Sequence, residues 1–222
     1  DSQNYFKIDK LQIGHTRLSI IDQQKSNQPM ISDKGNILAF NGEILNFKEL
    51  KKKYFKGIKF NSNGDTEVLL KGLELIGIDF LKEVRGFFAF AFYIKSKKEL
   101  ILARDHFGIK PLYYYINDKN LVFSSEISPI LKFKKFNLNI SKRIVFEYLC
   151  RSTPPYLETF YKNIFEIEPG SILKINMKKF KLDKVKYYKI ENAWKKEKKI
   201  KNSIKAQKKI SEIFNKSLKR YL

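Results

Sequence analysis

An almost unbroken apolar run at residues 86–93 constrains the fold of this chain more than any other feature. Its sequence is GFFAFAFY, and charged residues stand on both sides of it, at Arg85 and Lys95. It is much shorter than the roughly 20 apolar residues that a membrane-spanning helix needs. A short apolar run bounded by charge is typical of a strand with both faces buried. We therefore predict a central, fully buried strand here.

Further strands are predicted on both sides of this run. Residues 100–104 should pair with it across the polar turn at 96–98, and two later runs, at 112–116 and 121–124, have the spacing of a second hairpin. The remaining strand candidates are residues 11–21, 36–45, 172–176 and 184–190. Strands in hairpins, with helices set apart from them, predict an α+β layered fold.

Two helical patterns lie between these strands. The apolar spacing predicts two helices, at residues 46–54 and 65–76. Both lie between the strand predicted at 36–45 and the central strand at 86–93. Asn46 and Asp65 are the expected N-caps, and Gly77 is the expected C-terminal stop.

The last quarter of the chain changes in composition. A helix is predicted between Ser141 and Cys150, and a lysine-rich stretch at residues 194–203 has the character of a linker or an exposed helix. Beyond it, apolar residues recur on one helical face. They are Ile204, Ile210, Ile213, Phe214, Leu218, Tyr221 and Leu222. We expect this face to pack against a neighbouring domain, because nothing else in the chain could cover it.

The charge and the cysteine content argue against several function classes. The net charge is +22, but the lysines are scattered through almost every segment instead of forming one stripe interleaved with aromatics. A general preference for lysine explains them better than a nucleic-acid surface does, so we expect no nucleic-acid and no membrane partner. The one cysteine, Cys150, excludes a disulfide framework and a multi-cysteine metal cluster, and it indicates a reducing compartment.

Five polar motifs carry candidate chemistry, and each also has a purely structural interpretation. They are HTRLSIID at 15–22, NGEILN at 41–46, GDTE at 64–67, ARDHFGIKPLYY at 103–114 and SSE at 124–126. Arg17 offers a planar fork to a carboxylate, although a strand arginine more often forms a surface ion pair. The Gly42 N–H and the Asn41 amide suit an oxyanion, or the two residues form a simple turn. Asp65 either caps its helix or binds an ammonium.

The motif at 103–114 is interpreted as a structural turn that holds an Arg104–Asp105 pair. His106 alone would suggest acid–base work. However, no second histidine, cysteine or serine has the spacing of a catalytic triad or a metal site. The structural interpretation is therefore favoured.

In order and spacing, the five motifs resemble the class II glutamine amidotransferase domain of asparagine synthetases. Any one motif is weak, but five in sequence are a strong signature, and the resemblance covers residues 1–190. It implies an N-terminal nucleophile hydrolase-like fold, which is a four-layer α-β-β-α sandwich of antiparallel sheets. Residues 191–222 resemble a linker and the first helix of an ATP-pyrophosphatase synthetase domain, the rest of which is expected outside the chain.

The resemblance also implies roles for individual residues. In the family, the arginine that matches Arg17 binds the α-carboxylate of glutamine, and Glu43 and Asp65 match residues that hold the α-amino end. Asn41 and Gly42 match the oxyanion hole and are the expected catalytic residues. The substrate pocket is further lined by positions that match Leu18, Ile20 and Ile21. No metal ligand is expected among these residues.

One departure from the family pattern is serious. The family's nucleophile is a cysteine at the very N-terminus, whose own α-amine is the general base. Asp1 instead matches the aspartate of an Arg-Gly-Pro-Asp element that follows the first strand. We therefore expect the nucleophile strand to be missing and the chain as given to have no glutaminase activity. Cys150 is internal, has no α-amine of its own and is not expected to replace the nucleophile.

The parent protein that the resemblance implies is a cytoplasmic, ATP-dependent, glutamine-hydrolysing asparagine synthetase. Its glutaminase portion would supply ammonia to an adenylated aspartate, with ATP and magnesium in the synthetase domain and no cofactor in this fragment. Glutamine and the chain's own synthetase domain are the expected partners, and a homodimer is one open assembly. Two alternatives remain: an amidotransferase for another carboxylate, such as a surface-polysaccharide sugar acid, and a degenerate, non-catalytic scaffold domain. A basic nucleic-acid-binding protein ranks far behind them.

Overall fold

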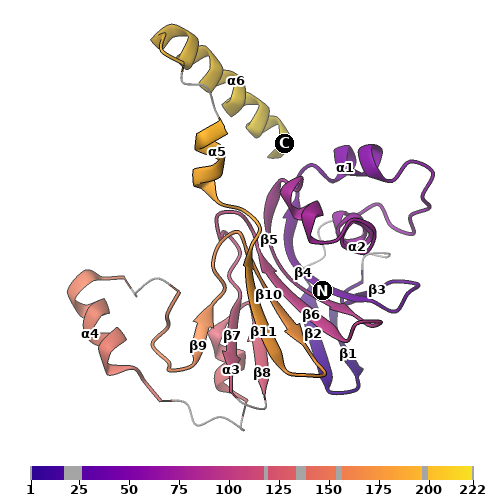
Figure 1. Ribbon diagram of the computed structural model, residues 1–222, viewed down its shortest axis with the longest axis vertical. Coiled ribbons are helices and arrows are strands. Elements are labelled where there is room, and N and C mark those ends of the chain that lie inside the picture. Colours follow the sequence, from indigo (N-terminus) through magenta and orange to yellow (C-terminus); the bar gives the residue numbers. More distant parts are fainter. Residues whose placement is uncertain are drawn as a thin grey trace.

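A six-stranded antiparallel sheet forms the centre of the computed structural model, which describes residues 2–17, 27–117, 120–133, 139–153, 157–196 and 200–221. The strand order is β11-β10-β6-β5-β4-β3 (Figure 1). The strands are β3 (Met30–Ile31), β4 (Ile37–Ile44), β5 (Gly86–Ile94), β6 (Glu99–Arg104), β10 (Ser171–Asn176) and β11 (Lys181–Lys186). The apolar run therefore forms β5, an interior strand between β4 and β6, as predicted.

Both faces of β5 are buried. Phe88, Phe90 and Phe92 point to one side, where they pack in a core with the helices. Ala89 and Ala91 alternate with them and belong to a second core on the other side of the sheet. On one face, the large phenylalanine side chains pack closely against the helices. On the other face, the small alanines leave room above the sheet.

The helical layer consists of α1 (Phe47–Tyr54), α2 (Asp65–Leu75) and the short 3₁₀ helix η1 (Ile78–Lys82). The predicted stop is confirmed, because α2 ends before Gly77, whose φ is 81°. The predicted cap of α2 is wrong: Gly64 is the N-cap and Asp65 is the first helical residue.

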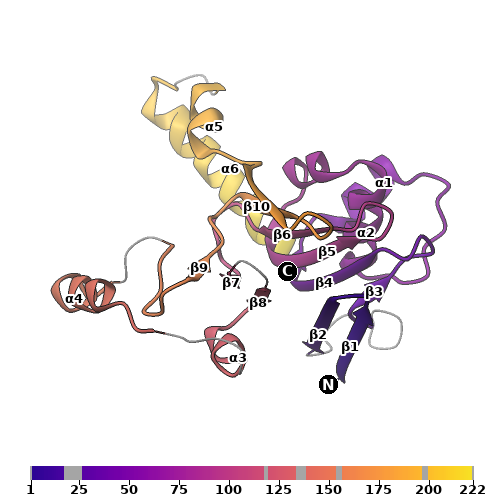
Figure 2. The same cartoon turned by 60° about the horizontal axis from the view of Figure 1, so that its bottom comes forward.

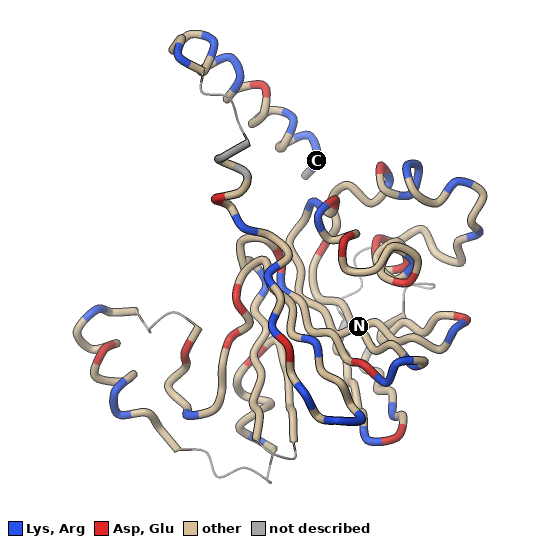
Figure 3. Tube along the Cα trace, viewed as in Figure 1, with Lys and Arg blue, Asp and Glu red and all other residues tan. Residues whose placement is uncertain are grey.

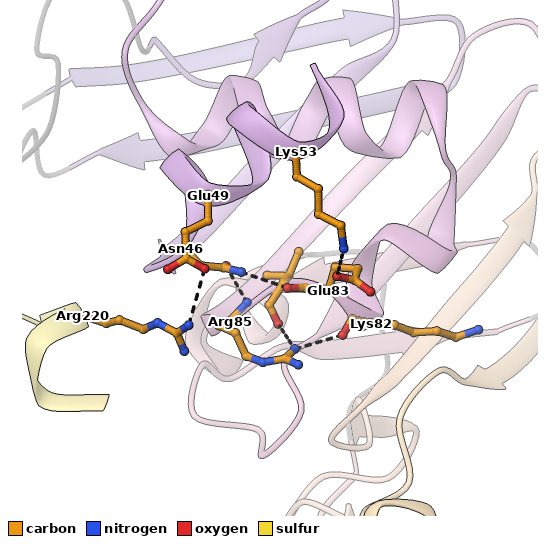
Figure 4. Close-up of polar contacts among 8 residues, drawn as sticks. Asn46, Glu49, Lys53, Lys82, Glu83, Arg85 and Arg220 are labelled. Atoms are coloured by element: carbon orange, nitrogen blue, oxygen red, sulfur yellow. Dashed lines mark hydrogen bonds and ion pairs between the residues drawn. The ribbon is translucent and has the colours of Figure 1, made fainter. Parts of the chain in front are cut away.

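Asn46 occupies the N-cap position of α1, but its side chain makes no capping hydrogen bond. Its amide nitrogen donates to the Glu83 carbonyl over 3.0 Å, and its amide oxygen accepts the Arg85 N–H over 2.8 Å (Figure 4). Asn46 therefore ties α1 to the segment that enters β5. Neighbouring residues alone could not show whether Asn46 and Asp65 cap their helices. Each side chain instead forms hydrogen bonds with a distant part of the chain.

A second β layer lies on the alanine side of the central sheet (Figure 2). It consists of the hairpin β1 (Ser2–Ile8) and β2 (Leu11–Arg17) and of a three-stranded sheet with the order β8-β7-β9. The latter contains β7 (Tyr113–Ile116), β8 (Leu121–Ser124) and β9 (Ile164–Glu166). Helix α3 (Ile127–Leu131) packs against this sheet through a third core around Tyr115, Ile130 and Ile164. The α+β layered sandwich of antiparallel sheets is thus confirmed, with a second β layer in two pieces.

The remaining helices project from this body (Figures 1 and 2). They are α4 (Lys142–Arg151), α5 (Ile190–Lys196) and α6 (Ser203–Tyr221). The strand predicted at 184–190 is misplaced, because β11 ends at Lys186 and α5 begins at Ile190. Apolar side chains on α6 are exposed, at Ile204, Ile210, Ile213, Phe214 and Leu218.

The basic residues are distributed over the whole tube of the chain (Figure 3). Lysines and arginines appear on α1, on the β10–β11 hairpin, on α4 and on α6, with acidic residues between them. This distribution agrees with the general preference for lysine that the sequence indicates. None of the helices in the described ranges has the length and apolar character to cross a membrane.

Candidate active site

A cavity of about 1060 Å³ lies between the central sheet and the second β layer. Its floor includes the alanines of the inner sheet face, where Ala39 of β4 stands opposite Ala91 of β5 and Ala89 is two residues away. Residues of β2, β4, β5, β8 and the first turn of α2 form the walls. The alanine methyl groups are small and leave the space above them open.

The pairing of β4 with β5 determines which backbone N–H and C=O groups of β4 point away from β5. Gly42 pairs with Phe88 of β5. Phe88, however, directs both of its backbone groups to the other side: Asp105 N donates to Phe88 O over 2.8 Å, and Phe88 N donates to Asp105 Oδ2 over 3.2 Å. Gly42 and Phe88 are therefore a non-hydrogen-bonded pair, and the backbone groups of Gly42 point away from β5.

The same alternation turns the N–H groups of Phe40 and Ile44 to this open side of β4, beyond the short contact with β3. Phe40 N donates to Gln28 Oε1 over 2.6 Å, and Ile44 N donates to Asp65 Oδ2 over 2.8 Å. Within the part of the chain that the structure describes, the Gly42 N–H between them has no acceptor. One backbone donor on the cavity wall is therefore available to a ligand.

Position 42 must be a glycine for steric reasons. Its φ is 144°, and a Cβ atom there would lie 2.1 Å from the Phe87 carbonyl oxygen and 2.7 Å from the Phe88 Cα. Any side chain would push β4 away from β5. The close approach keeps the available N–H in a fixed place.

Asp65 reaches the same wall from the start of α2. Asp65 is only 7% exposed, and its Oδ2 accepts the Ile44 N–H. Burial raises the pKa of the Asp65 carboxyl, and the neighbouring Glu43 carboxylate adds to this, whereas hydrogen bonds from Ile44 and Thr66 oppose it. A buried carboxylate with a raised pKa is poised to gain from a cationic ligand.

A second buried carboxylate shapes the loop that leads to Asp65. Glu67 accepts hydrogen bonds from Asn61 N, Ser62 N and Ser62 Oγ over 2.6–3.0 Å, and Lys71 Nζ lies 3.5 Å away. Burial tends to raise the pKa of Glu67, but these hydrogen bonds and Lys71 outweigh it and the pKa is lowered. Glu67 therefore stays ionised and holds the loop over the first turn of α2.

Four predicted site residues come together in this place. Asn41, Gly42, Glu43 and Asp65 all line the cavity. Arg17 is the last residue of β2, two residues beyond His15, whose Nε2 donates to the Phe40 carbonyl over 3.0 Å. The Arg17 backbone pairs with Ser2 at the end of the β1–β2 hairpin, and the Arg17 side chain lies outside the described part of the chain. The other predicted pocket residues lie outside the described ranges; they are Leu18, Ile20 and Ile21.

Many cavity residues carry no role that the sequence predicts, and among them are Gln28, His15 and Thr66. Gln28 and His15 bond to the two backbone groups of Phe40, 12 and 25 residues away along the chain. No local pattern signals such contacts. Thr66 stands in the GDTE motif, and its position in the first turn of α2 was the available signal.

The turn at 103–114 is structural, but the predicted Arg104–Asp105 pair is wrong. Arg104 forms its ion pair with Glu166 over 2.8 Å. The fully buried Asp105 instead accepts backbone N–H groups, from Phe88, Phe107, Ile109 and Lys110. An aspartate beside an arginine in sequence points to the opposite side of an extended strand, so adjacency does not pair them.

His106 and Cys150 stand apart from the cavity. Burial and the nearby Arg85 lower the pKa of His106 to about 4, against the pull of Asp105, and its ring packs against Tyr188. Cys150 is exposed on α4 and is not among the cavity residues. The described ranges contain no group of three or more His, Cys, Asp or Glu side chains that could hold a metal ion.

The wall thus offers a backbone N–H, a side-chain amide at Asn41 and two carboxylates within one short stretch of β4 and α2. Such a set can polarise a carbonyl oxygen and hold an ammonium group. A family model described as "Glutamine amidotransferase domain" matches residues 1–188, and the chain belongs to this family.

Curated relatives carry the names of asparagine-forming enzymes. The chain is 34% identical over 203 residues to a putative glutamine-hydrolysing asparagine synthetase 2 of Methanocaldococcus jannaschii, which covers 83% of this chain and 39% of that protein. It is 36% identical over 173 residues to glutamine-hydrolysing asparagine synthetase 1 of Bacillus subtilis, covering 77% of this chain and 27% of that protein. The chain therefore spans well under half the length of these relatives and is similar to their glutamine amidotransferase part.

A solved structure agrees with the fold. Glutamine phosphoribosylpyrophosphate amidotransferase from B. subtilis superposes with a TM-score of 0.55 at 24% identity, covering 80% of this chain and 35% of that one. At this identity the likeness concerns the fold alone.

Proposed function

We propose that this domain binds L-glutamine in the cavity and forms the glutaminase portion of a longer, asparagine-forming enzyme. The observation that carries the proposal is the wall of β4, where the Gly42 N–H, which no described residue accepts, lies between Asn41, the half-buried Glu43 and the buried Asp65. A side-chain amide, an α-ammonium and an α-carboxylate are the three polar groups of glutamine. The wall matches the first two directly.

Each residue has a defined task in this proposal. The Gly42 N–H and the Asn41 amide donate to the carbonyl oxygen of the glutamine side chain, and they stabilise the charge that develops there when the carbonyl is attacked. Asp65 and Glu43 hold the α-ammonium. Arg17 binds the α-carboxylate, and Leu18, Ile20 and Ile21 line the pocket beside it.

The nucleophile in this proposal belongs to a segment of the longer protein outside residues 1–222. In the described ranges β2 pairs only with β1, and β8 pairs only with β7, while residues of both β2 and β8 line the cavity. An extended segment between them would join the two pieces of the second β layer into one sheet. Such a segment would pass over the alanine floor and bring an N-terminal cysteine to Gly42.

The C-terminal part extends the same proposal. Residues 1–190 constitute the glutamine amidotransferase domain, and residues 191–222 form a linker and the first helix of a synthetase domain. The exposed apolar face of α6 supports this assignment, because such a face needs a partner surface. ATP and magnesium act in that further domain, where aspartate is the proposed ammonia acceptor, and the cytoplasm is the proposed location.

Calorimetry with L-glutamine tests the binding proposal on the chain itself. We expect measurable binding to the unaltered chain and its loss in Arg17→Ala and in Asp65→Asn, because each variant removes one charged contact. Arg143→Ala serves as the matched control, because Arg143 does not line the cavity. It lies on α4 and forms ion pairs with Glu147 and Glu158. Identical heats for the unaltered chain and Arg17→Ala would reject the site and favour a non-catalytic scaffold.

A glutamate-release assay tests the catalytic part. We expect none from residues 1–222 and release from the full-length protein if its N-terminal residue is a cysteine. Release by residues 1–222 that disappears in Cys150→Ala would contradict the proposal.

A further inference from the structure

We propose that Gln28 is a positioning residue of the glutaminase site: by accepting the Phe40 N–H it holds the edge of β4 so that Gly42 presents the N–H group that no described residue accepts. This inference rests on the proposed function, because it assigns Gln28 a part in the same site. Gln28 belongs to none of the five sequence motifs, and it lies 12 residues before Phe40, the β4 residue that it contacts.

Gln28 is buried together with the group that it contacts. Its residue is only 6% exposed, and its Oε1 accepts Phe40 N over 2.6 Å. A buried amide oxygen with a buried backbone N–H satisfies two groups that would each be costly alone. The contact is therefore part of the folded wall and not a surface contact that forms and breaks freely.

The edge of β4 that faces away from β5 carries a row of backbone donors. Phe40, Gly42 and Ile44 all direct their N–H groups away from β5, and successive members of such a row stand about 6.6 Å apart. Gln28 takes the first and Asp65 takes the third. Among the described residues only the Gly42 N–H of this row is left for a ligand, which can therefore bind in one register. Without Gln28, a second donor would compete for the same carbonyl group.

Phe40 is also held by a second side chain, that of His15. His15 Nε2 donates to the Phe40 carbonyl over 3.0 Å, so both outward groups of this residue are engaged by side chains. Phe40 is thereby fixed at both ends, and Asn41 and Gly42 follow it directly along the strand. Because Phe40 directly precedes Asn41 and Gly42, fixing it restricts the orientation of the Gly42 peptide group. A binding site needs its donors to be held rigidly in this way.

The contact between Gln28 and Phe40 is of the same chemical kind as the contact proposed between the substrate and Gly42. The Gln28 side chain is a carboxamide whose oxygen sits on a β4 N–H. The proposed substrate places an identical carboxamide oxygen on the next outward N–H, two residues along the strand. The wall therefore already binds one glutamine side chain, its own, beside the place proposed for the substrate.

Three variants separate a positioning role from a packing role. Gln28→Met keeps the length and volume but removes the acceptor, whereas Gln28→Glu keeps an oxygen acceptor at the same place. Gln12→Met is the matched control, because Gln12 is exposed on β2 and does not line the cavity. The measurements are amide hydrogen exchange at Phe40, the Gly42 amide resonance with and without L-glutamine, and calorimetric affinity.

We expect the Phe40 amide to exchange at least about tenfold faster in Gln28→Met and to stay protected in Gln28→Glu. The Gly42 resonance should move in Gln28→Met even without ligand, and glutamine affinity should fall roughly three- to tenfold. Gln28→Glu should restore the Gly42 resonance, and Gln12→Met should match the unaltered chain. Rescue by the acceptor-preserving variant is an outcome that mere filling of space would not give.

Several results would overturn the inference. One is an unchanged Gly42 resonance in a folded Gln28→Met chain in which Phe40 exchanges faster. Another, which remains available if Gln28→Met does not fold, is a folded Gln28→Glu chain whose Phe40 amide has lost protection. Absence of glutamine binding in the unaltered chain would instead contradict the proposed function, and the ligand-free Phe40 and Gly42 measurements would still decide the role of Gln28.

Discussion

Asp65 and Asp105 are two buried aspartates beside the same pair of strands, and they differ in how fully their oxygens are used. Asp105 is 0% exposed and accepts four backbone N–H groups from the turn at 103–114 and from β5. Asp65 is almost as buried and lines the cavity, but it accepts only the Ile44 N–H from a distant part of the described chain, together with hydrogen bonds from the adjacent Thr66, whose hydroxyl lies 3.4 Å away. The first carboxylate is saturated and structural, while the second keeps capacity for a ligand.

The comparison shows that burial alone does not identify a functional carboxylate. A buried charge whose hydrogen bonds are complete stabilises the fold, and a buried charge with few of them raises its own pKa and gains from a cation. The raised pKa of Asp65 is in line with the second description. The number of donors around each oxygen therefore separates the two aspartates.

The largest expected effect is that of Asp105→Asn. The amide keeps one acceptor oxygen and introduces an NH₂ group where backbone N–H groups converge, so several buried donors lose their partner. We expect the free energy of unfolding to fall by about 3 to 5 kcal/mol, measured by denaturant unfolding. Asp65→Asn should cost much less, because the Ile44 N–H keeps an amide oxygen as acceptor. Equal losses in both variants would remove the distinction between the two aspartates.

The next effect concerns the close contact of β4 with β5. Gly42→Ala places a methyl group 2.1 Å from the Phe87 carbonyl oxygen, and we expect a loss of about 2 kcal/mol or more in stability together with loss of glutamine binding. Gly57→Ala is the control: Gly57 has a φ of 80° but no atom within 4 Å of an added Cβ. It therefore measures the backbone strain without the clash. Equal destabilisation in the two variants would mean that strain alone fixes position 42.

A third effect is the pH dependence of glutamine affinity. Only ionised Asp65 attracts an ammonium, so affinity should fall about tenfold per pH unit below the pKa of Asp65 and level off above it. Because burial raises this pKa, the fall should begin at a higher pH than for an ordinary aspartate. In the ligand-free chain the sign is opposite: protonated Asp65 favours folding, and this contribution is lost as pH rises through the raised pKa. Calorimetry of the unaltered chain from pH 4 to pH 8 measures this dependence, and an affinity that does not change over this range would contradict the role of Asp65.

The smallest expected effect lies where α6 touches α1 (Figure 4). Arg220 and Glu49 form a pair at 3.5 Å, and the Glu49 side chain is 64% exposed. Solvent screens such a pair, so Arg220→Ala should change stability by less than about 0.5 kcal/mol and leave glutamine binding unchanged. A loss as large as that of Gly42→Ala would show that this corner supports the site after all.

The sequence predicts the layers of this fold better than the contacts inside its site. The run at β5 has a single plausible interpretation, because eight apolar residues between charges suit only a buried strand. The motif residues Asn41, Gly42, Glu43 and Asp65 were also found to lie together.

Contacts between distant residues were not predictable in this way. Asp65 was expected to cap its helix, yet it bonds to Ile44, 21 residues earlier. Gln28 carries no local signal, and its role depends on a strand that is placed by the rest of the sheet. Hydrogen-bond partners follow from the three-dimensional register, which a local pattern does not contain.

The alanine floor of the cavity has a thermodynamic consequence. Water above Ala39, Ala89 and Ala91 meets methyl groups and finds few hydrogen-bond partners. Any chain or ligand that covers this floor releases that water, so its binding should carry a negative heat-capacity change. The enthalpy of association should consequently become more favourable as temperature rises, with the polar wall at Gly42 and Asp65 setting the orientation and the floor setting the temperature dependence.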